Sequence, residues 1–516
     1  MAFMKYSFYF FDLPQTPSTQ MAGTALFLAL FLVQTCVAPA VNNDHDDLAP
    51  YTLDSVITPR SAGADQSNRC GDIDNCRTLA SIVISCLGTI FACVWVAVHK
   101  NMPGPEQTWI SVQLESLKVV IMTLLVPEWV LAWAVRQFLR AREIAKELEE
   151  ARLSAFKRGR GDDAGREGGD AREDDDETRL LGPQTTSESI SERPTFTVEL
   201  WDLEEKLGRT DQPWTIVHGF FIIMGGFHYY RNGKPMWAMA CGSRRGLVRN
   251  TPYEDKDVRT LVQSRTLVPP TVDELGDKSK GDTLSKTVAV TQTLWFIAQC
   301  IARRAQGIVI TNLEIMTLAY TVITVAMYAA WWHKPLNVRC PVRVKGDLSR
   351  AKKTHRFDWT DVIDYVTGDQ DSFTSLHERN RVPTFWSDSS SLRGKIPLHA
   401  DIIALSVAVV FGAVHCAAWP YTFPSPTEKA LWRASALAIT AIPIPMAVAF
   451  VVFDPFDAAD GPNGLYDYIP LVCMALGGLL YIPARIILLA LSFSTLRNLP
   501  LSAFQTVQWT TFVPHI

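Results

Sequence analysis

Long apolar blocks separated by charged segments organise this sequence. Each block lacks the alternation of apolar and polar positions that a barrel strand shows, and about 20 apolar residues span the hydrocarbon core of a bilayer as a helix. The blocks are Leu79–Val98, Val119–Leu139, Trp214–Tyr230, Thr287–Ile301, Ile308–Trp332, Leu398–Trp419, Ala430–Phe453 and Ile469–Leu491. The pattern predicts an all-α, polytopic transmembrane helical bundle of about eight spans, within a range of roughly seven to nine.

The N-terminal segment has the pattern of a targeting signal. Met21–Ala40 is apolar and ends in Ala38-Pro39-Ala40, which has the small-x-small form of a signal-peptidase site. We interpret residues 1–40 as a signal peptide or an uncleaved signal anchor. Either form translocates the residues that come after it, so we expect residues 41–78 on the lumenal or extracellular side. The protein is therefore expected in a secretory-pathway membrane, either the plasma membrane or an endomembrane.

The charges between the blocks predict an orientation. We expect transmembrane helices in 79–139, 214–332 and 398–493, connected by the segments 140–213, 231–286 and 333–397 and followed by a tail over 494–516. Lys and Arg lie near the membrane ends of 231–286 and 333–397, so the positive-inside rule places both loops in the cytosol. Eight crossings would then leave both termini outside.

A basic run after the second block conflicts with eight simple crossings. It extends from Arg136 to Arg160, and eight crossings would place it outside. The alternative is a chain broken at Pro127, with two short helices around the break and a re-entrant segment over Trp214–Tyr230. Eight crossings are slightly favoured.

The segment 140–213 and the overall composition limit the classes of partner. Glycines, acids, bases and serines without apolar periodicity predict that 140–213 is largely disordered. A net charge of -4, no strongly basic region and no zinc-finger spacing argue against a nucleic-acid ligand.

Most of the ten cysteines lie in apolar runs, and two differ in their surroundings. Cys70 and Cys76 flank the polar stretch GDIDN on the expected oxidising side, and they could close a small loop as a disulfide or remain two free thiols. No other cysteine or histidine spacing matches a structural metal site, so we expect neither a metal nor a cofactor.

Polar residues inside the apolar blocks are the strongest functional signal, because charge in a bilayer is costly. Glu314, Thr317 and Thr321 recur at helical steps on the fifth block, while Gln299 and Arg303 share a face of the fourth. If the two helices form a hairpin, Arg303 lies within reach of Glu314. The stripes then form either an interhelical hydrogen-bonded seam with an ion pair, which is favoured, or the lining of an ion or solute path.

Two further intramembrane charges need partners. Glu128 follows Pro127 in the second block, and we expect it to pair with Lys118, Arg136 or a residue of another helix. Arg485 shares a face of the last block with Tyr481, and it is expected to meet an acid or an anionic lipid headgroup.

Several strings resemble those of a known group of proteins. They are CLGTIFACVWVAVHKNMPGP, HGFFIIMGGF, DKSKGDTLSK, ITNLEIMTLAY, WWHKP, FPSPTEKALWR and WTTFVPHI, and they cover nearly all of the chain after Cys70. In this order they resemble landmarks of uncharacterised multi-pass membrane proteins of filamentous fungi. The resemblance implies a fungal source and a shared helical core. That family has no established activity, so the resemblance transfers no catalytic residue.

Three functional classes are consistent with these features, with the lipid bilayer as the common partner. An ion channel or small-solute transporter would use the polar stripes and Glu314. A membrane receptor or scaffold would bind cytosolic proteins through its loops. An intramembrane lipid-modifying enzyme, the third class, would need His218, His399, Asp401 and His415 to converge. Transport ranks first, and no catalytic motif such as GxSxG or HExxH supports the enzyme.

Overall fold

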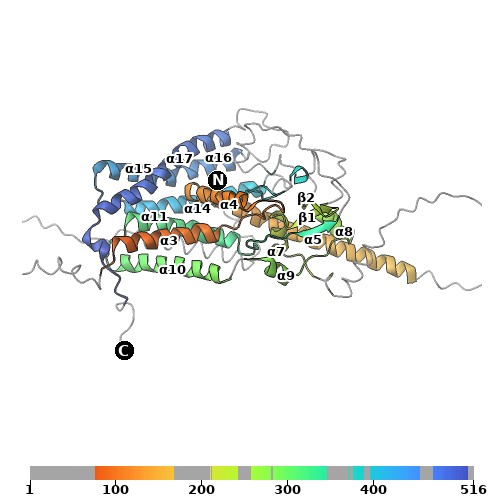
Figure 1. The fold of residues 1–516 in the computed structure, drawn as a ribbon. Coiled ribbons are helices and arrows are strands. Elements are labelled where there is room, and N and C mark those ends of the chain that lie inside the picture. The colour runs from red at the N-terminus through yellow and green to blue at the C-terminus, as the bar shows by residue number, and fades with distance from the viewer. Residues whose placement is uncertain are drawn as a thin grey trace, which may run out of the picture.

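The computed structural model describes most of the chain outside its N-terminal segment (Figure 1). The residues described are 76–167, 208, 210, 212–241, 257–280, 283–345, 371, 376–379, 381–388, 395–453 and 469–509. The signal predicted over 1–40 and Cys70 lie outside these residues, so the signal and the disulfide stay predictions.

Helices of similar direction form a bundle that occupies one half of the molecule (Figure 1). They are α3 (Leu79–Ala97), α10 (Thr283–Ala305), α11 (Asn312–Ala330), α14 (Lys395–His415), α15 (Pro426–Ala441), α16 (Pro443–Phe453) and α17 (Ile469–Ser494). Five segments are long and apolar enough to cross a membrane, with α15 and α16 together forming one of them. A sixth arises if one bent helix pair counts as a single span, so the predicted count of eight is not confirmed.

The burial pattern of the bundle is that of a membrane protein. Helix α11 is the central helix, and most of its residues are buried. The outer helices expose large apolar side chains, among them Ile84 and Phe91 of α3 and Leu479 of α17. Such a continuous apolar exterior is unfavourable in water and suits lipid tails, which supports membrane association.

The bundle has two ends, which are named here by one residue each. At the Arg77 end, the start of α3 meets the start of α11 through the Arg77–Glu314 pair. At the Lys334 end, the segment after α11 meets the segment after α3 through a hydrogen bond from Lys334 to the carbonyl oxygen of His99. Helices α3 and α11 are therefore parallel and cross the bundle in the same direction.

Helices α4 (Trp109–Leu125) and α5 (Pro127–Glu167) form a re-entrant pair. They meet at a 113° bend, because Pro127 cannot continue the hydrogen-bond ladder of α4 and instead starts a new helix. Both outer parts contact the same segment at the Lys334 end, since Glu115 of α4 pairs with Arg381 and Gln137 of α5 donates to the carbonyl of Trp386. We call the bend at Pro127 the hairpin tip.

The hairpin tip lies at the middle of the bundle. The carbonyl oxygen of Leu124, at the end of α4, accepts hydrogen bonds from Tyr320 and Arg485, which lie near the middle of α11 and α17. The chain break expected at Pro127 is thus present, and the basic run after it lies at the same end of the bundle as the segments after α3 and α11.

The third apolar block is not a transmembrane helix. Within Trp214–Tyr230 the structure has the eight-residue helix α7 (Ile216–Ile223) followed by strand β1 (Phe227–Arg231). Gly225, with φ at +91°, ends the helix in a conformation that only glycine adopts readily. The block is apolar because it is buried within an extramembrane layer, which hydropathy alone does not distinguish from burial in lipid.

This extramembrane layer packs at the Lys334 end (Figure 1). Strands β2 (Lys234–Ala238), β1 and β3 (Val342–Lys345) form a sheet in the order β2-β1-β3, with β1 antiparallel to β2 and parallel to β3. Two short helices, α8 (Val258–Gln263) and α9 (Val272–Lys278), complete the layer.

The layer packs against the part of α5 that extends beyond the bundle, from about Ala141 onward. A methyl group at Gly219 of α7 would lie 2.2 Å from the carbonyl oxygen of Ala141, so the two helices approach as closely as a glycine permits. Helix α5 continues to Glu167, well into the segment 140–213 that composition predicts to be largely disordered. The buried positions Ile144, Leu148 and Ala151 of α5 explain this extension, because their helical spacing gives α5 an apolar face under the layer.

Candidate functional site

The predicted stripe residue Glu314 lies at the Arg77 end and is paired from two sides. Its oxygens accept two hydrogen bonds from Arg77, at 2.5 and 3.1 Å, and Arg303 lies 4.0 Å away. The same carboxylate caps α11, because it accepts from the backbone and hydroxyl of Thr311. Sequence reasoning missed Arg77, which lies in a polar segment far from Glu314 along the chain. The environment of Glu314 is that of a structural ion pair.

The other stripe residues are satisfied within the helices. The hydroxyl of Thr317 donates to the carbonyl of Leu313, and that of Thr321 donates to Leu318. Gln299 of α10 is half-buried and is not brought to Glu314 by any hydrogen bond that the structure describes. Threonines on α11 therefore allow close helix packing, and the structure does not join them into one site with Glu128.

Glu128 lies at the hairpin tip, in the first turn of α5. Only 8% of its surface is exposed. The charge of Arg485 and the hydroxyl of Tyr481, both on α17, act on its carboxylate. Of the partners considered from sequence, the structure thus selects another helix over Lys118 and Arg136. Arg136 instead pairs with Asp401 of α14, at 2.7 and 2.8 Å.

Aromatic rings pack against Arg485. Its guanidinium lies over the rings of Tyr320 and Phe411, at 5.1 and 4.3 Å from their centroids, and donates to the hydroxyl of Tyr320 at 2.8 Å. The Met316 sulfur lies 3.4 Å from Nε2 of His415 and 3.9 Å from Nη1 of Arg485. We call Glu128, Tyr320, His415, Tyr481 and Arg485 the central cluster.

Three polar atoms of the central cluster are buried without a hydrogen-bond partner among the residues the structure describes. They are Oε2 of Glu128, the hydroxyl oxygen of Tyr481 and Nε of Arg485, although the Tyr481 hydroxyl still lies close enough to the Glu128 carboxylate to act on it. A buried unpaired polar atom costs about 1–3 kcal/mol, more when it is charged, so three in one cluster require an explanation. A group that exchanges its partner or its proton during function is one such explanation.

The four residues of the enzyme hypothesis do not converge. Nδ1 of His218 accepts from the backbone of Thr215 at the start of α7, and Nε2 lies in hydrogen-bond contact with the carbonyl of Pro270 in the extramembrane layer. Burial in this layer lowers the pKa of His218. His415 faces Met316 in the bundle, and Asp401 pairs with Arg136. Within the ranges that the structure describes, no group of three His, Cys, Asp or Glu could hold a metal ion.

Lys334 is a buried cation that sequence reasoning did not single out. Its ammonium group donates to the carbonyl of His99, to Asn101 and to Gln137, and lies 4.9 and 5.1 Å from the ring centroids of Trp133 and Trp331. Burial lowers the pKa of Lys334 well below its usual value, while the acceptors and the two ring faces favour the charged form. In the sequence, WWHKP follows an apolar block and looks like the aromatic and basic residues that usually lie at a membrane–water interface. For this reason the sequence does not mark Lys334 as buried.

The polar residues around Lys334 also bind the segment 381–388. The amide of Asn101 donates to the carbonyls of Pro383, Thr384 and Trp386, and Gln137 donates to Trp386 as well. This Lys334 network therefore fastens an extramembrane segment to the bundle.

Asp388, at the end of that segment, is a second buried carboxyl group. Burial raises its pKa to about 7; nearby Arg140 acts to lower it and nearby Asp371 to raise it. Its Oδ2 lies 3.8 Å from Nε of Arg140. Arg140 is itself fully buried and donates to the carbonyls of Asp388 and Cys241.

Asp388→Asn is expected to remove a pH dependence of stability. An unfolded Asp titrates near roughly 3.9, so between about pH 4 and 7 the folded state holds a proton that the unfolded state has lost. The stability contributed by protonated Asp388 is thus lost as pH rises through this window. Asparagine cannot ionise and tolerates the positive φ of 57° at this position.

The measurement compares apparent melting temperatures in detergent at pH 4.5 and 7.5. Relative to wild type, Asp388→Asn should gain stability at the higher pH only. Asp277→Asn, which removes an exposed carboxylate of α9, serves as the control and should match wild type. Equal differences between Asp388→Asn and wild type at both pH values would refute the assignment.

Together, the lipid-compatible bundle and its five candidate membrane-spanning helices describe a mostly helical protein and support membrane association. The chain belongs to a family of unknown function, DUF8562, whose model matches residues 49–180, 187–354 and 376–516. No curated protein matches the chain. No solved structure matches it either.

Proposed function

We propose that this protein translocates an ion across its membrane and that Glu128 at the hairpin tip is the ion-binding group. The observation that carries the proposal is the position of a buried, incompletely paired carboxylate at the centre of the bundle. Charged residues at such depth are rare and usually belong to ion or proton pathways.

The architecture supports this function in a second way. Re-entrant helices are tolerated at membrane depth where they are enclosed by protein, and in transporters the ends of such helices form substrate and ion sites. Here the hairpin tip brings the first turn of α5, with its partially positive amide groups, next to Arg485. Both features would hold the negative charge of Glu128 in place between binding events.

The orientation of the pathway is inferred from the positive-inside rule. The Lys334 end carries the basic residues of outer α5, including Arg142, Lys146 and Arg152, together with those of the sheet and its neighbours. We assign this end to the cytosol and the Arg77 end to the lumenal or extracellular side. The re-entrant pair removes the conflict that eight simple crossings created for the basic run.

The test uses purified full-length protein in liposomes. Wild type should carry current or tracer flux for at least one ion under an imposed membrane potential, and Glu128→Gln should reduce it at least tenfold. Glu115→Gln, which changes a partly exposed carboxylate at the outer part of α4, should retain wild-type flux. Unchanged flux in a folded Glu128→Gln protein, or no flux in wild type for any ion tested, would contradict the proposal.

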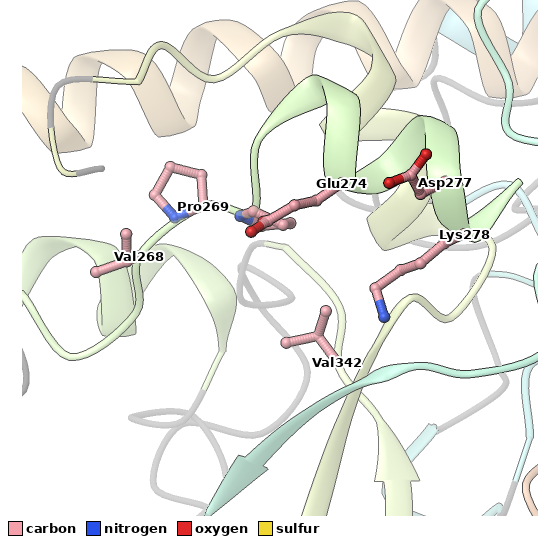
Figure 2. Close-up of a pocket in the computed structure, with 7 residues that line it drawn as sticks. Val268, Pro269, Glu274, Asp277, Lys278 and Val342 are labelled. Carbon is pink, nitrogen blue, oxygen red and sulfur yellow. The ribbon is translucent and has the colours of Figure 1, made fainter. Parts of the chain in front are cut away.

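A receptor or scaffold is the second candidate, and one feature of the extramembrane layer favours it. An open hollow of about 540 Å³ lies between α9, the preceding Pro269–Pro270 segment and β3. Figure 2 shows the charged side chains of Glu274, Asp277 and Lys278 of α9 at this hollow, with Val342 of β3 opposite. A peptide partner bound there would leave ion flux unchanged and would be released by Lys278→Glu.

A further inference from the structure

We propose that the translocated ion is the proton, carried by the carboxyl group of Glu128. This inference rests on the proposed function and names its substrate. Three properties of the central cluster lead to it: the ligands it offers, the space around them, and the arrangement of hydroxyl and carboxyl groups through the bundle.

The ligand set does not suit a metal cation. Na⁺, K⁺ and Ca²⁺ require several oxygen ligands, typically six to eight for Ca²⁺. The central cluster offers one carboxylate, the hydroxyls of Tyr320 and Tyr481 and the carbonyl of Leu124, which already accepts from Tyr320 and Arg485, next to the permanently charged guanidinium of Arg485. A second cation at this place would be repelled by Arg485, whereas a proton on Glu128 adds no ligand requirement.

The packing does not suit a larger anion. Arg485 is 2% exposed, Phe411 and His415 are fully buried, and the rings of Tyr320 and Phe411 cover the guanidinium. Two open hollows lie on the extramembrane layer and along α10, and neither is lined by a residue of this cluster. A proton needs no cavity, because it moves between hydrogen-bonded groups.

The groups around Glu128 act on its charge in opposite directions. Burial favours the neutral acid, while Arg485 and the helix start favour the carboxylate. Tyr481 and Arg485 of α17 face Glu128, and so does Tyr320 of α11. His415 of α14 lies near Arg485 and acts on Glu128 only through it. Helix α4 has no titratable side chain after Lys118. On α5 itself the next charged residue is Arg136.

Carboxyl groups occur at three depths of the bundle. Arg136, which holds Asp401, lies about 12 Å along α5 from Glu128 toward the Lys334 end. Glu314 lies about 9 Å along α11 from Tyr320 toward the Arg77 end. Glu128 is the middle member and the one with an unpaired oxygen atom.

The proposed step is a simple proton transfer. A proton from one side converts the Glu128 carboxylate to the carboxylic acid, and its loss to the other side restores the carboxylate. Arg485 does not carry the proton, because a guanidinium group does not give up its proton in proteins. While Glu128 is neutral, Arg485 keeps its hydrogen bonds to Tyr320 and the carbonyl of Leu124.

The experiment measures proton flux and other ion fluxes separately. Full-length protein is placed in liposomes that contain a pH-sensitive dye, a membrane potential is imposed with potassium and valinomycin, and tracer sodium and chloride are measured in parallel. Wild type should acidify the lumen, Glu128→Gln should slow this at least tenfold, and Glu128→Asp should recover most of it. Sodium and chloride should pass at the rate of protein-free liposomes.

Controls keep the outcomes distinguishable. Gel filtration and melting temperature establish that Glu128→Gln is folded, and Glu115→Gln should transport protons like wild type. Flux of sodium or chloride that depends on Glu128, without proton flux, would overturn this inference while leaving the proposed function intact. No flux of any ion would overturn both, as would proton flux that Glu128→Gln leaves unchanged.

Discussion

Glu314→Ala is expected to lower the apparent melting temperature of the protein by about 5–10 °C, which corresponds to roughly 3–5 kcal/mol of stability. The substitution leaves the buried Arg303 and the partly buried Arg77 without their shared carboxylate and removes one half of the capping box of α11. Removing one partner of a buried ion pair is far more damaging than removing one from the surface, because the remaining charge stays desolvated. Thermal unfolding in detergent, monitored by size-exclusion fluorescence, gives the measurement.

A surface pair provides the matched control. Glu115 and Arg381 are both partly exposed, so Glu115→Ala should change stability by no more than about 1 kcal/mol. If Glu314 instead lined an ion path, Glu314→Ala would abolish flux while the protein kept its melting temperature. That result would reverse the assignment of Glu314 to a structural pair and move the pathway toward the Arg77 end.

Lys334→Met should destabilise the junction between the bundle and the extramembrane layer by about 3 kcal/mol. Methionine fills much of the same space but cannot donate to Asn101 and Gln137 or bind the faces of Trp133 and Trp331. Hydrogen bonds from a charged donor contribute about 1.5–3 kcal/mol each, and buried cation–π contacts add to them.

The location of this effect distinguishes it from general unfolding. Because Asn101 and Gln137 also hold the segment 381–388, limited proteolysis of Lys334→Met should cut this segment sooner than wild type. Lys280→Met removes an exposed lysine of the same layer and should leave both readouts unchanged. Wild-type proteolysis and melting temperature in Lys334→Met would show that the Lys334 network does not fasten the layer.

The helical membrane character could be predicted from the sequence because it depends on apolar blocks that exceed a bilayer's thickness, and that property is local. A chain break at Pro127 was a predicted alternative, since a proline and a misplaced basic run both appear in the sequence. The re-entrant segment, however, was expected at Trp214–Tyr230, where the structure has α7 and β1. The span count failed at Trp214–Tyr230, where burial in the extramembrane layer produces the same hydropathy as burial in lipid.

The sites were harder to predict, because their partners are distant along the chain. Glu314 stood out as an intramembrane acid, but Arg77 is 237 positions away in a polar segment. Glu128 and Arg485 were each recognised as costly charges, yet only the fold places α17 against the hairpin tip. Lys334 remained hidden because a lysine at a span end usually reaches the lipid headgroups.

The contact between the two ends of the described chain bears on how the protein is synthesised. The side chain of Arg77 donates to the carbonyl of Ala503, 426 positions later, its backbone donates to Phe504, and Arg303 donates to the same Ala503 carbonyl. Both arginines are therefore synthesised before these acceptors. The Arg77 end is completed only when Ala503 and Phe504 have left the ribosome, and a chain that stops before Ala503 would present two incompletely bonded arginines to the quality-control machinery of the cell.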